Sequence, residues 1–432
     1  MSRTAGTLTI VRAWPRQRQV PFWPRERVAA LRDRRLRAIA RHAARHVPHY
    51  AGLDLRRIVS VADLDRLPVI SRADLLEAPA AFQSTAVRAD RSLVVRTSGS
   101  TGEPLDVRHD GPSALRNIAY SERERAVDAA LLGGRGGHRV VALEYSLGTL
   151  LEVRAFYDAA AYRPRRPALT LVPSEEGVDA AIAALARLRP EVVVGAGSWI
   201  ETVFRAVAAT PGAHRPALVV YGGSGVSSDG RALIEDELGI PVVSRYNAGE
   251  AFKIGYTCEA RAGFHLHEDL CHVELVDGSG TAPVADGERG EVVISNLVNR
   301  GTVLLRYRLG DHARLTTDPC ACGRTSTRLL DLEGKRSVVV RLPDGAPLHA
   351  RALWGVLKRV EGVRRFQLVQ REQDRFEARL QTADRATYDT ILPAVLTGLG
   401  ALLPGCRVDA SYHERLEAAP GERFEPILAL GE

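Results

Sequence analysis

The pattern of apolar and polar positions divides the chain into a helical beginning, a long alternating middle and a compact final unit. Residues 24–45 carry apolar positions at helical spacing and predict a helix, and residues 63–77 predict a turn that enters a second helix. Residues 91–110 predict a strand, a Gly/Ser/Thr loop and a second strand.

The middle of the chain, from about residue 112 to 220, alternates helical patterns with four short β-branched runs: RVVALEYS, ALTLVP, EVVVGAG and ALVVYGG. Strands separated by helices imply crossover connections and a largely parallel sheet. Residues 241–330 change to short strands with polar turns, which predicts an antiparallel or barrel-like subdomain.

After Gly334 the pattern changes again, to strands mixed with helices near 350–360 and 386–401. We therefore predict an α/β protein with two domains. Residues 1–333 would form a large domain of parallel-rich sheets with helices and a small β-barrel-like subdomain. Residues 334–432 would form a small α+β domain, joined at a hinge near Gly334–Arg336.

Charge and composition add one chemical constraint. The 432 residues carry a net charge of +7, and only three of the 59 basic residues are lysine: Lys253, Lys335 and Lys358. Because arginine does not lose its proton, any lysine-dependent step must use one of these three. The arginine-rich stretch from Trp14 to Tyr50 could bind nucleic acid, but no nucleic-acid motif accompanies it, so the solvated face of an amphipathic helix is favoured.

Cysteine usage and hydropathy bear on the compartment. Five unevenly spaced cysteines in a chain of this length argue against a disulfide framework. The N-terminus lacks a signal-peptide pattern, and no apolar run approaches the roughly 18 residues that span a bilayer. We expect a soluble cytoplasmic monomer or homodimer with no membrane partner and no nucleic-acid partner.

The strongest local motif is TSGSTGEP, from Thr97 to Pro104. Glycines let successive backbone N–H groups face one concavity, and the hydroxyls add donors, so such a loop binds phosphates. It is not a Walker loop, because Glu103 stands where lysine might follow the last glycine. A plain hairpin turn is the alternative interpretation.

A second glycine-rich segment, YGGSGVSSDGRALIEDEL at 221–238, partly matches a dinucleotide-binding fingerprint. Its third glycine would fall on Ser228, which argues against a nicotinamide site. A nucleotide could still lie against these glycines.

Taken in order, these motifs resemble the phenylacetate–CoA ligase branch of the adenylate-forming ligase superfamily. The resemblance covers TSGSTGEP, the segment from YGGSG to YNAGE, the block GTVLLRYRLGDHARL and the segment CACGRTSTR, after a lead-in beginning VPHYAGLDL. It extends from about residue 45 to the C-terminus.

The resemblance implies an ATP site. Tyr246 would stack on adenine, Asp311 would accept the ribose hydroxyls, and Glu250 would be catalytic and coordinate Mg²⁺, although Glu250 could instead cap a helix and Asp311 could end a strand. The other implied ATP-binding residues are Thr97, Ser98, Gly99, Ser100, Thr101, Gly102, Gly222, Gly223, Ser224, Asn247 and Arg324.

The implied chemistry is activation of a carboxylic acid by ATP to an acyl-adenylate, followed by displacement of AMP, usually by coenzyme A. The small C-terminal domain would rotate between the two steps. Two alternatives are an amide-forming ligase with an amine acceptor and a catalytically weakened nucleotide- or nucleic-acid-binding homologue.

One departure from the family pattern concerns the adenylating lysine. Its position near the C-terminus corresponds to PGERFEP, where Arg423 stands. Arg423 could do the work of that lysine, Lys335 or Lys253 could do it from another direction, or adenylation could be weak and the acceptor unusual.

The acyl pocket is expected to be lined by Tyr145, Gly195, Trp199, Ala248 and Phe252, which would favour a flat, aromatic acid. For any one aromatic side chain among them, ordinary core packing is an equal alternative.

Four residues, Cys258, His265, Cys320 and Cys322, could form a structural Zn²⁺ site. The pair at 320 and 322 is spaced more tightly than usual, and buried cysteines in a reducing cytoplasm are the alternative. His267, Cys271 and His272 could replace one ligand, whereas Cys406 is expected in the core.

Overall fold

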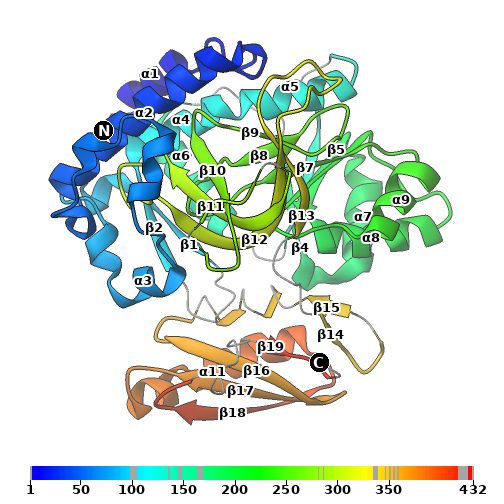
Figure 1. The fold of residues 1–432 in the computed structure, drawn as a ribbon. Helices are drawn as coiled ribbons and strands as arrows, with labels where there is room; N and C mark the ends of the chain where they lie inside the picture. The colour runs from blue at the N-terminus through cyan, green and yellow to red at the C-terminus, as the bar shows by residue number, and fades with distance from the viewer. Residues whose placement is uncertain are drawn as a thin grey trace.

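The computed structural model describes the chain except for residues 1, 98–104, 135–136, 145–147, 163–168, 281, 286, 334–338, 346, 350–351, 354–355, 358–359, 417–426 and 431–432. Figure 1 shows a large unit, coloured blue to yellow, above a small C-terminal unit in orange and red.

The N-terminal part is mostly helical, as the sequence predicts. It contains α1 (Arg3–Ala13), α2 (Arg25–His46), α3 (Arg72–Glu77) and the short 3-10 helices η1 (Val20–Phe22), η2 (Pro48–Tyr50), η3 (Leu55–Arg57), η4 (Val61–Arg66), η5 (Pro79–Phe82) and η6 (Ala89–Arg91). The predicted helix at 24–45 is confirmed as α2, whereas α1 was not predicted.

Helix α2 is amphipathic. Leu36, Ile39, Ala40 and Ala43 are buried, at the spacing that places them on one face. On the same helix Arg35 Nη1 donates to the Asp269 carboxylate at 2.8 Å. At least this arginine of the basic stretch therefore pairs with a buried carboxylate of the protein itself.

The strand–loop–strand unit predicted at 91–110 is confirmed. Strands β1 (Ser92–Thr97) and β2 (Leu105–Asp110) form an antiparallel pair, and α4 (Gly111–Tyr120) and α5 (Glu122–Leu131) follow. Asp110 caps α4 by accepting a hydrogen bond from the Ser113 backbone N–H at 3.1 Å.

The alternating middle forms the parallel half of an eleven-stranded sheet. Its strands lie in the order β4-β3-β5-β6-β7, all parallel. The elements are β3 (Val140–Glu144), α6 (Gly148–Ala160), β4 (Leu169–Pro173), η7 (Ser174–Glu176), α7 (Gly177–Leu188), β5 (Val192–Ala196), α8 (Gly197–Ala209), β6 (Leu218–Gly222), α9 (Ser228–Ala232), the π turn η8 (Leu233–Glu237) and β7 (Val242–Tyr246).

The region at 241–330 supplies antiparallel strands, and they continue the same sheet. From β7 the order runs β8-β9-β13-β12-β11-β10, so hydrogen bonding is unbroken between the two halves. These strands are β8 (Gly255–Thr257), β9 (Phe264–Leu266), β10 (Cys271–Val276), β11 (Arg289–Asn296), β12 (Tyr307–Thr316) and β13 (Arg328–Glu333).

The C-terminal unit has its own sheets. Strands β14 (Val339–Arg341) and β15 (Pro347–His349) pair with each other, and the order β18-β17-β16-β19 forms a four-stranded sheet. Its elements are β16 (Arg365–Glu372), β17 (Arg375–Gln381), α11 (Arg385–Leu402), β18 (Arg407–His413) and β19 (Ile427–Leu428). Among the described strands none of these joins the large sheet. The hinge at 334–336 lies outside the described residues, so the domain boundary stays a prediction.

The parallel half requires a glycine at one close approach. A Cβ on Gly195 of β5 would lie 2.1 Å from the Leu143 carbonyl oxygen of the neighbouring strand β3. Backbone atoms cannot move aside as a flexible side chain can, so this position excludes any other residue without a shift of the strands.

We therefore expect Gly195→Ala to lower the free energy of unfolding by about 1–3 kcal/mol, the usual cost of overpacking. Gly225→Ala is the matched control, since a Cβ there would meet nothing within 4 Å. Urea unfolding of both variants checks this, and equal stabilities would contradict it.

Candidate active site and a Cys/His cluster

The candidate nucleotide site lies at the edge of the sheet where the parallel strands end. In register, Ala196 of β5 pairs with Gly222 of β6, and Gly222 pairs with Arg245 of β7. Tyr246 follows at the end of β7. The carboxyl ends of parallel strands are where α/β proteins bind ligands, because loops and helix N-termini gather there.

The glycine segment after β6 is held tightly against the start of α8. Gly223 has a φ of 70°, a left-handed conformation that favours glycine. The Ser224 hydroxyl lies 2.8 Å from the Ser198 hydroxyl and accepts the Ser198 backbone N–H at 3.1 Å. A Cβ on Gly197 would lie 2.3 Å from the Ser224 carbonyl oxygen. The predicted Gly222–Ser224 segment thus has a fixed backbone at this edge.

Tyr246 and Asp311 are brought together from β7 and β12. The Tyr246 hydroxyl donates to Asp311 Oδ2 at 2.7 Å. Burial, followed by the charge of Asp311, raises the pKa of Tyr246 well above its usual value, so the hydroxyl keeps its proton. The adjacent Asn247 is exposed. Two residues predicted to contact one nucleoside therefore meet across the sheet.

Glu250 is buried at the same edge. Its carboxylate accepts a hydrogen bond from the Tyr307 hydroxyl at 3.3 Å, and its backbone carbonyl accepts one from Asn296 Nδ2 at 3.0 Å. A buried carboxylate needs such donors or a cation to offset its desolvation. Glu250 caps no helix described here, in contrast to the alternative considered above.

Thr97, which opens the predicted phosphate loop, lies against this segment. A Cβ on Gly249 would come within 2.6 Å of Thr97 Cγ2, so the two residues are in direct contact. The predicted residues 98–102 lie outside the described residues. The contact nevertheless places the start of the TSGSTG sequence beside Glu250.

The segment that carries Tyr246 and Glu250 is fastened at both ends to a buried carboxylate. Lys253 Nζ donates to Glu124 Oε2 at 2.6 Å, and the Arg245 guanidinium lies 3.8 Å from the same oxygen. His267 Nε2 also contacts Glu124, at 3.3 Å. Burial acts to raise the pKa of Glu124. The pKa is nevertheless lowered, and the positive charge of Lys253 is the largest of the effects that lower it.

This network bears on the replacement of the adenylating lysine. The amine of Lys253 forms an ion pair with the buried Glu124 carboxylate. In this structure Lys253 therefore holds the segment in place. The two other residues considered, Lys335 and Arg423, lie outside the described residues.

The predicted acyl-pocket residues separate into different parts of the core. Trp199 packs in the cluster beneath α7 and α8, whereas Phe252 belongs to a second cluster between β1 and α4. Phe252 stacks on His109, with ring centroids 3.8 Å apart. Ala248 packs at the edge of a third cluster. Tyr145 lies outside the described residues, so an acyl pocket lined by this set stays a prediction.

His109 is a buried histidine in contact with the segment that carries Glu250. Its Nε2 lies 2.7 Å from the Gly249 carbonyl oxygen and must donate there. Burial lowers the pKa of His109 to about 4, so the ring is neutral at neutral pH.

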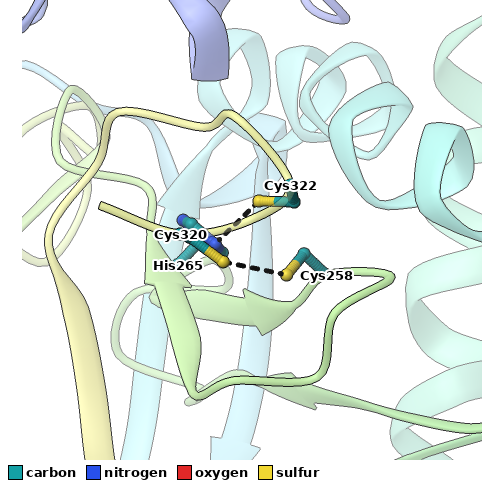
Figure 2. A group of neighbouring side chains, drawn as sticks. All are labelled: Cys258, His265, Cys320 and Cys322. Atoms are coloured by element: carbon teal, nitrogen blue, oxygen red, sulfur yellow. Dashed lines mark hydrogen bonds between the residues drawn. The ribbon is translucent and has the colours of Figure 1, made fainter. Parts of the chain in front are cut away.

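Four predicted metal ligands lie close together in the structure (Figure 2). Cys258 follows β8, His265 lies on β9, and Cys320 and Cys322 come from the loop between β12 and β13. One donor atom from each lies within 4.8 Å of the others. Cys258 Sγ and Cys320 Sγ are 3.7 Å apart, and Cys322 Sγ is 3.3 Å from His265 Nε2. The first distance is far too long for a disulfide.

Arg324 belongs to this cluster. Its guanidinium pairs with Glu259 at 2.9 Å and lies 5.0 Å from the centre of the Phe22 ring. Its backbone N–H donates to Cys322 Sγ at 3.5 Å. Among the described contacts of Arg324 none reaches Tyr246 or Asp311, so the structure places this predicted ATP ligand beside the cysteines instead.

Two site residues were missed by the sequence analysis, Arg72 and Tyr307. Arg72 Nη1 donates to Thr97 Oγ1 at 3.2 Å, and Tyr307 contacts Glu250. Both lie within segments that carry the family resemblance, ISRADLLE and YRLGD, but nothing local marks their side chains as partners.

Comparisons with known proteins find phenylacetate–coenzyme A ligases that are similar to this chain. The chain is 25% identical over 372 residues to a phenylacetate–coenzyme A ligase from Thermus thermophilus, covering 83% of this chain and 81% of the relative. It is 27% identical over 326 residues to one from Aromatoleum evansii, covering 72% and 71%. A further one, from Escherichia coli, is 26% identical over 329 residues, with the same coverage. No family model matches the chain.

Among solved structures, 2-hydroxyisobutyryl-CoA ligase in its postadenylation state superposes with a TM-score of 0.60 over 96% of this chain and 91% of that one, at 19% identity. Its thioesterification state gives a TM-score of 0.59 over the same shares, at 20% identity. This likeness confirms the predicted fold class.

The ordered motifs and these relatives make the chain phenylacetate–CoA ligase-like, at about 25% identity over most of its length. None of the described helices combines the length and the apolar character needed to cross a bilayer.

The histidine beneath the site makes stability depend on pH. His109 has a pKa of about 4 in the folded chain and about 6.5 when unfolded, so the unfolded state binds more protons between these values. Its contribution is present above pH 6.5 and is lost as the pH falls towards 4, by up to about 3 kcal/mol.

We expect His109→Gln, which keeps a donor for the Gly249 carbonyl, to lose less stability between pH 7 and pH 5 than the wild type. The exposed His312→Gln is the control. Urea unfolding at both pH values checks this, and an unchanged pH dependence in His109→Gln would be evidence against it.

Proposed function

We propose that this protein activates a carboxylic acid with ATP to an acyl-adenylate and then transfers the acyl group to coenzyme A, giving an acyl-CoA thioester. The observation that carries the proposal is the convergence of Tyr246, Asp311, Glu250 and Thr97 at the carboxyl edge of the parallel strands. The relatives named as phenylacetate–coenzyme A ligases support an aryl or arylacetic acid and a thioester product.

In the first step, a carboxylate oxygen of the acid attacks the α-phosphorus of ATP and pyrophosphate leaves. Glu250 would hold Mg²⁺, a hard cation that prefers carboxylate oxygens and phosphates and would supply charge neutralisation. Tyr246 and Asp311 would bind the nucleoside, and the residues from Thr97 to Gly102 would cradle the phosphates.

In the second step, the thiol sulfur of coenzyme A attacks the acyl carbon, the bond to AMP breaks and the thiol proton is released. Rotation of the C-terminal unit about Gly334–Arg336 would exchange the groups presented to the two half-reactions. Arg423, at the position of the family's adenylating lysine, and Lys335 are the candidate cations for the first one. An amine acceptor would give an amide by the same displacement.

The proposal is tested by acid-dependent pyrophosphate release with a panel of aryl and arylacetic acids. We expect Glu250→Gln to lower kcat/KM by about 100-fold, because the carboxylate would stabilise charge in the transition state through Mg²⁺. Glu77→Gln, an exposed position on α3, is the control. Turnover of Glu250→Gln equal to the control would refute the magnesium assignment.

The product identifies the acceptor. Coenzyme A or free amines are added after adenylation, and the product is weighed by mass spectrometry. A thioester mass supports the proposal, an amide mass would replace coenzyme A by an amine, and tight ATP binding without pyrophosphate release would indicate a non-catalytic homologue.

We also propose that Cys258, His265, Cys320 and Cys322 bind a structural Zn²⁺ ion. Tetrahedral zinc with ordinary bond lengths separates two sulfur ligands by about 3.8 Å and a sulfur from a nitrogen by about 3.6 Å. The 3.7 and 3.3 Å separations here fit that geometry. The Ser326 hydroxyl, 3.1 Å from His265 Nδ1, would orient the ring. Four protein ligands leave no open position for catalysis.

Purified protein should therefore contain about one zinc per chain, which metal analysis measures. Cys322→Ser should lose most of the zinc and lower the melting temperature. Cys406→Ser, in the C-terminal unit, is the matched control. Zinc near zero in the wild type, or zinc retained in full by Cys322→Ser, would remove the site.

A further inference from the structure

The start of α3 is held by the backbone of β12. The Ile70 N–H donates to the Arg306 carbonyl oxygen at 2.7 Å, and the Arg308 N–H donates to the Ile70 carbonyl oxygen at 2.9 Å. Ile70 thereby forms a parallel bridge with Tyr307. The lead-in to α3 is therefore fixed beside the first residue of β12.

A capping box then sets where the helix begins. The Asp74 carboxylate accepts the Ser71 N–H at 2.7 Å, and the Ser71 hydroxyl accepts the Asp74 N–H at 3.3 Å. The next residue, Arg72, is consequently at the first helical position, two residues from the bridge at Ile70. Its backbone has little freedom to move relative to Tyr307.

The Arg72 side chain joins two parts of the candidate site. It donates to Thr97 Oγ1 at 3.2 Å, and its charge also acts on the neighbouring Tyr307, whose hydroxyl contacts Glu250 at 3.3 Å. The path Thr97–Arg72–Tyr307–Glu250 thus spans from the start of the phosphate-loop sequence to the buried carboxylate.

The charges of the neighbouring groups determine which side chain donates in these hydrogen bonds. Burial and the neighbouring Glu250 carboxylate raise the pKa of Tyr307, so its hydroxyl remains a donor to Glu250. Arg72 is permanently charged and presents several donors in a planar fork, so it can hold a threonine and a tyrosine oxygen at the same time.

We propose that Arg72 is a positioning residue of the nucleotide site, which sets the separation between Thr97 and the Glu250 carboxylate. The inference rests on the proposed function, because it takes Thr97 to begin the phosphate-binding loop and Glu250 to hold Mg²⁺. The ligand concerned is the magnesium complex of a nucleoside triphosphate. Arg72 acts through Thr97 and Tyr307.

The test compares Arg72→Gln, Arg72→Lys and Tyr307→Phe with the wild type. Arg66→Gln is the matched control, since Arg66 lies in the same lead-in but is largely exposed, 3.5 Å from Asp63. Four quantities are measured for each: the affinity for ATP with Mg²⁺ by calorimetry without acid, the Mg²⁺ concentration for half-maximal pyrophosphate release, the KM of the acid and the melting temperature.

We expect Arg72→Gln to weaken ATP binding with Mg²⁺ by about 10-fold and to raise the half-maximal Mg²⁺ concentration similarly, because charged hydrogen bonds are lost. The KM of the acid and the melting temperature should stay close to those of the control. Arg72→Lys should be intermediate, since an ammonium keeps the charge but not the fork. The double variant Arg72→Gln/Tyr307→Phe should be little worse than Arg72→Gln alone, because the two residues act in one path.

Other outcomes would overturn the inference. ATP binding and Mg²⁺ dependence within twofold of the control would show that Arg72 does not position the site. If the ATP affinity, the Mg²⁺ dependence and the KM of the acid all worsen equally and the melting temperature falls, Arg72 only stabilises the fold. If the wild type releases no pyrophosphate with any acid, the proposed function fails, and calorimetry still decides on Arg72. A wild type that binds no ATP with Mg²⁺ would overturn both.

Discussion

The candidate active site depends on a single buried carboxylate, that of Glu124 on α5. Arg245 and Lys253 reach it from the two ends of the segment that carries Tyr246, Gly249 and Glu250. Removing two or more charges from water is costly, and only their close pairing offsets that cost. The pairing is therefore favourable only in a narrow range of geometries, and it fixes the positions of the residues between Arg245 and Lys253.

The continuous sheet extends this control to distant parts of the sequence. Its parallel half brings the ends of β5, β6 and β7 to one edge, and its antiparallel half supplies Tyr307 and Asp311 on β12. Two separate sheets could shift against each other, whereas shared backbone hydrogen bonds allow little movement. Tyr246 and Asp311 form a hydrogen bond although 65 positions of the sequence separate them.

The sequence predicted the alternating strands and helices well, because their hydrophobic periods are local. Motifs also pointed to Tyr246 and Asp311, which form a hydrogen bond, and to the Cys/His cluster, whose four donor atoms lie close together. Ion pairs between distant residues leave no such trace. Glu124 and Lys253 are 129 positions apart, and neither lies in a pattern that names its partner.

The same limit applies to side chains that a motif contains but does not orient. Arg324 follows the cysteines in a family segment, yet its direction is set by Glu259 and Phe22, which belong to other parts of the chain. Trp199 and Phe252 are apolar residues that cluster packing alone assigns to different cores. Tertiary contacts, unlike hydrophobic periodicity, can be established only from the structure.

The hydrogen bond from the Thr325 N–H to the Pro21 carbonyl, 2.9 Å long, has a consequence for how the chain acquires its shape. Arg25 likewise donates to the Thr317 carbonyl at 3.1 Å. These contacts of Pro21 and Arg25 join residues some three hundred positions apart, so they cannot form while the ribosome is still making the first half of the protein. They therefore form late, and non-local closure of this kind slows folding.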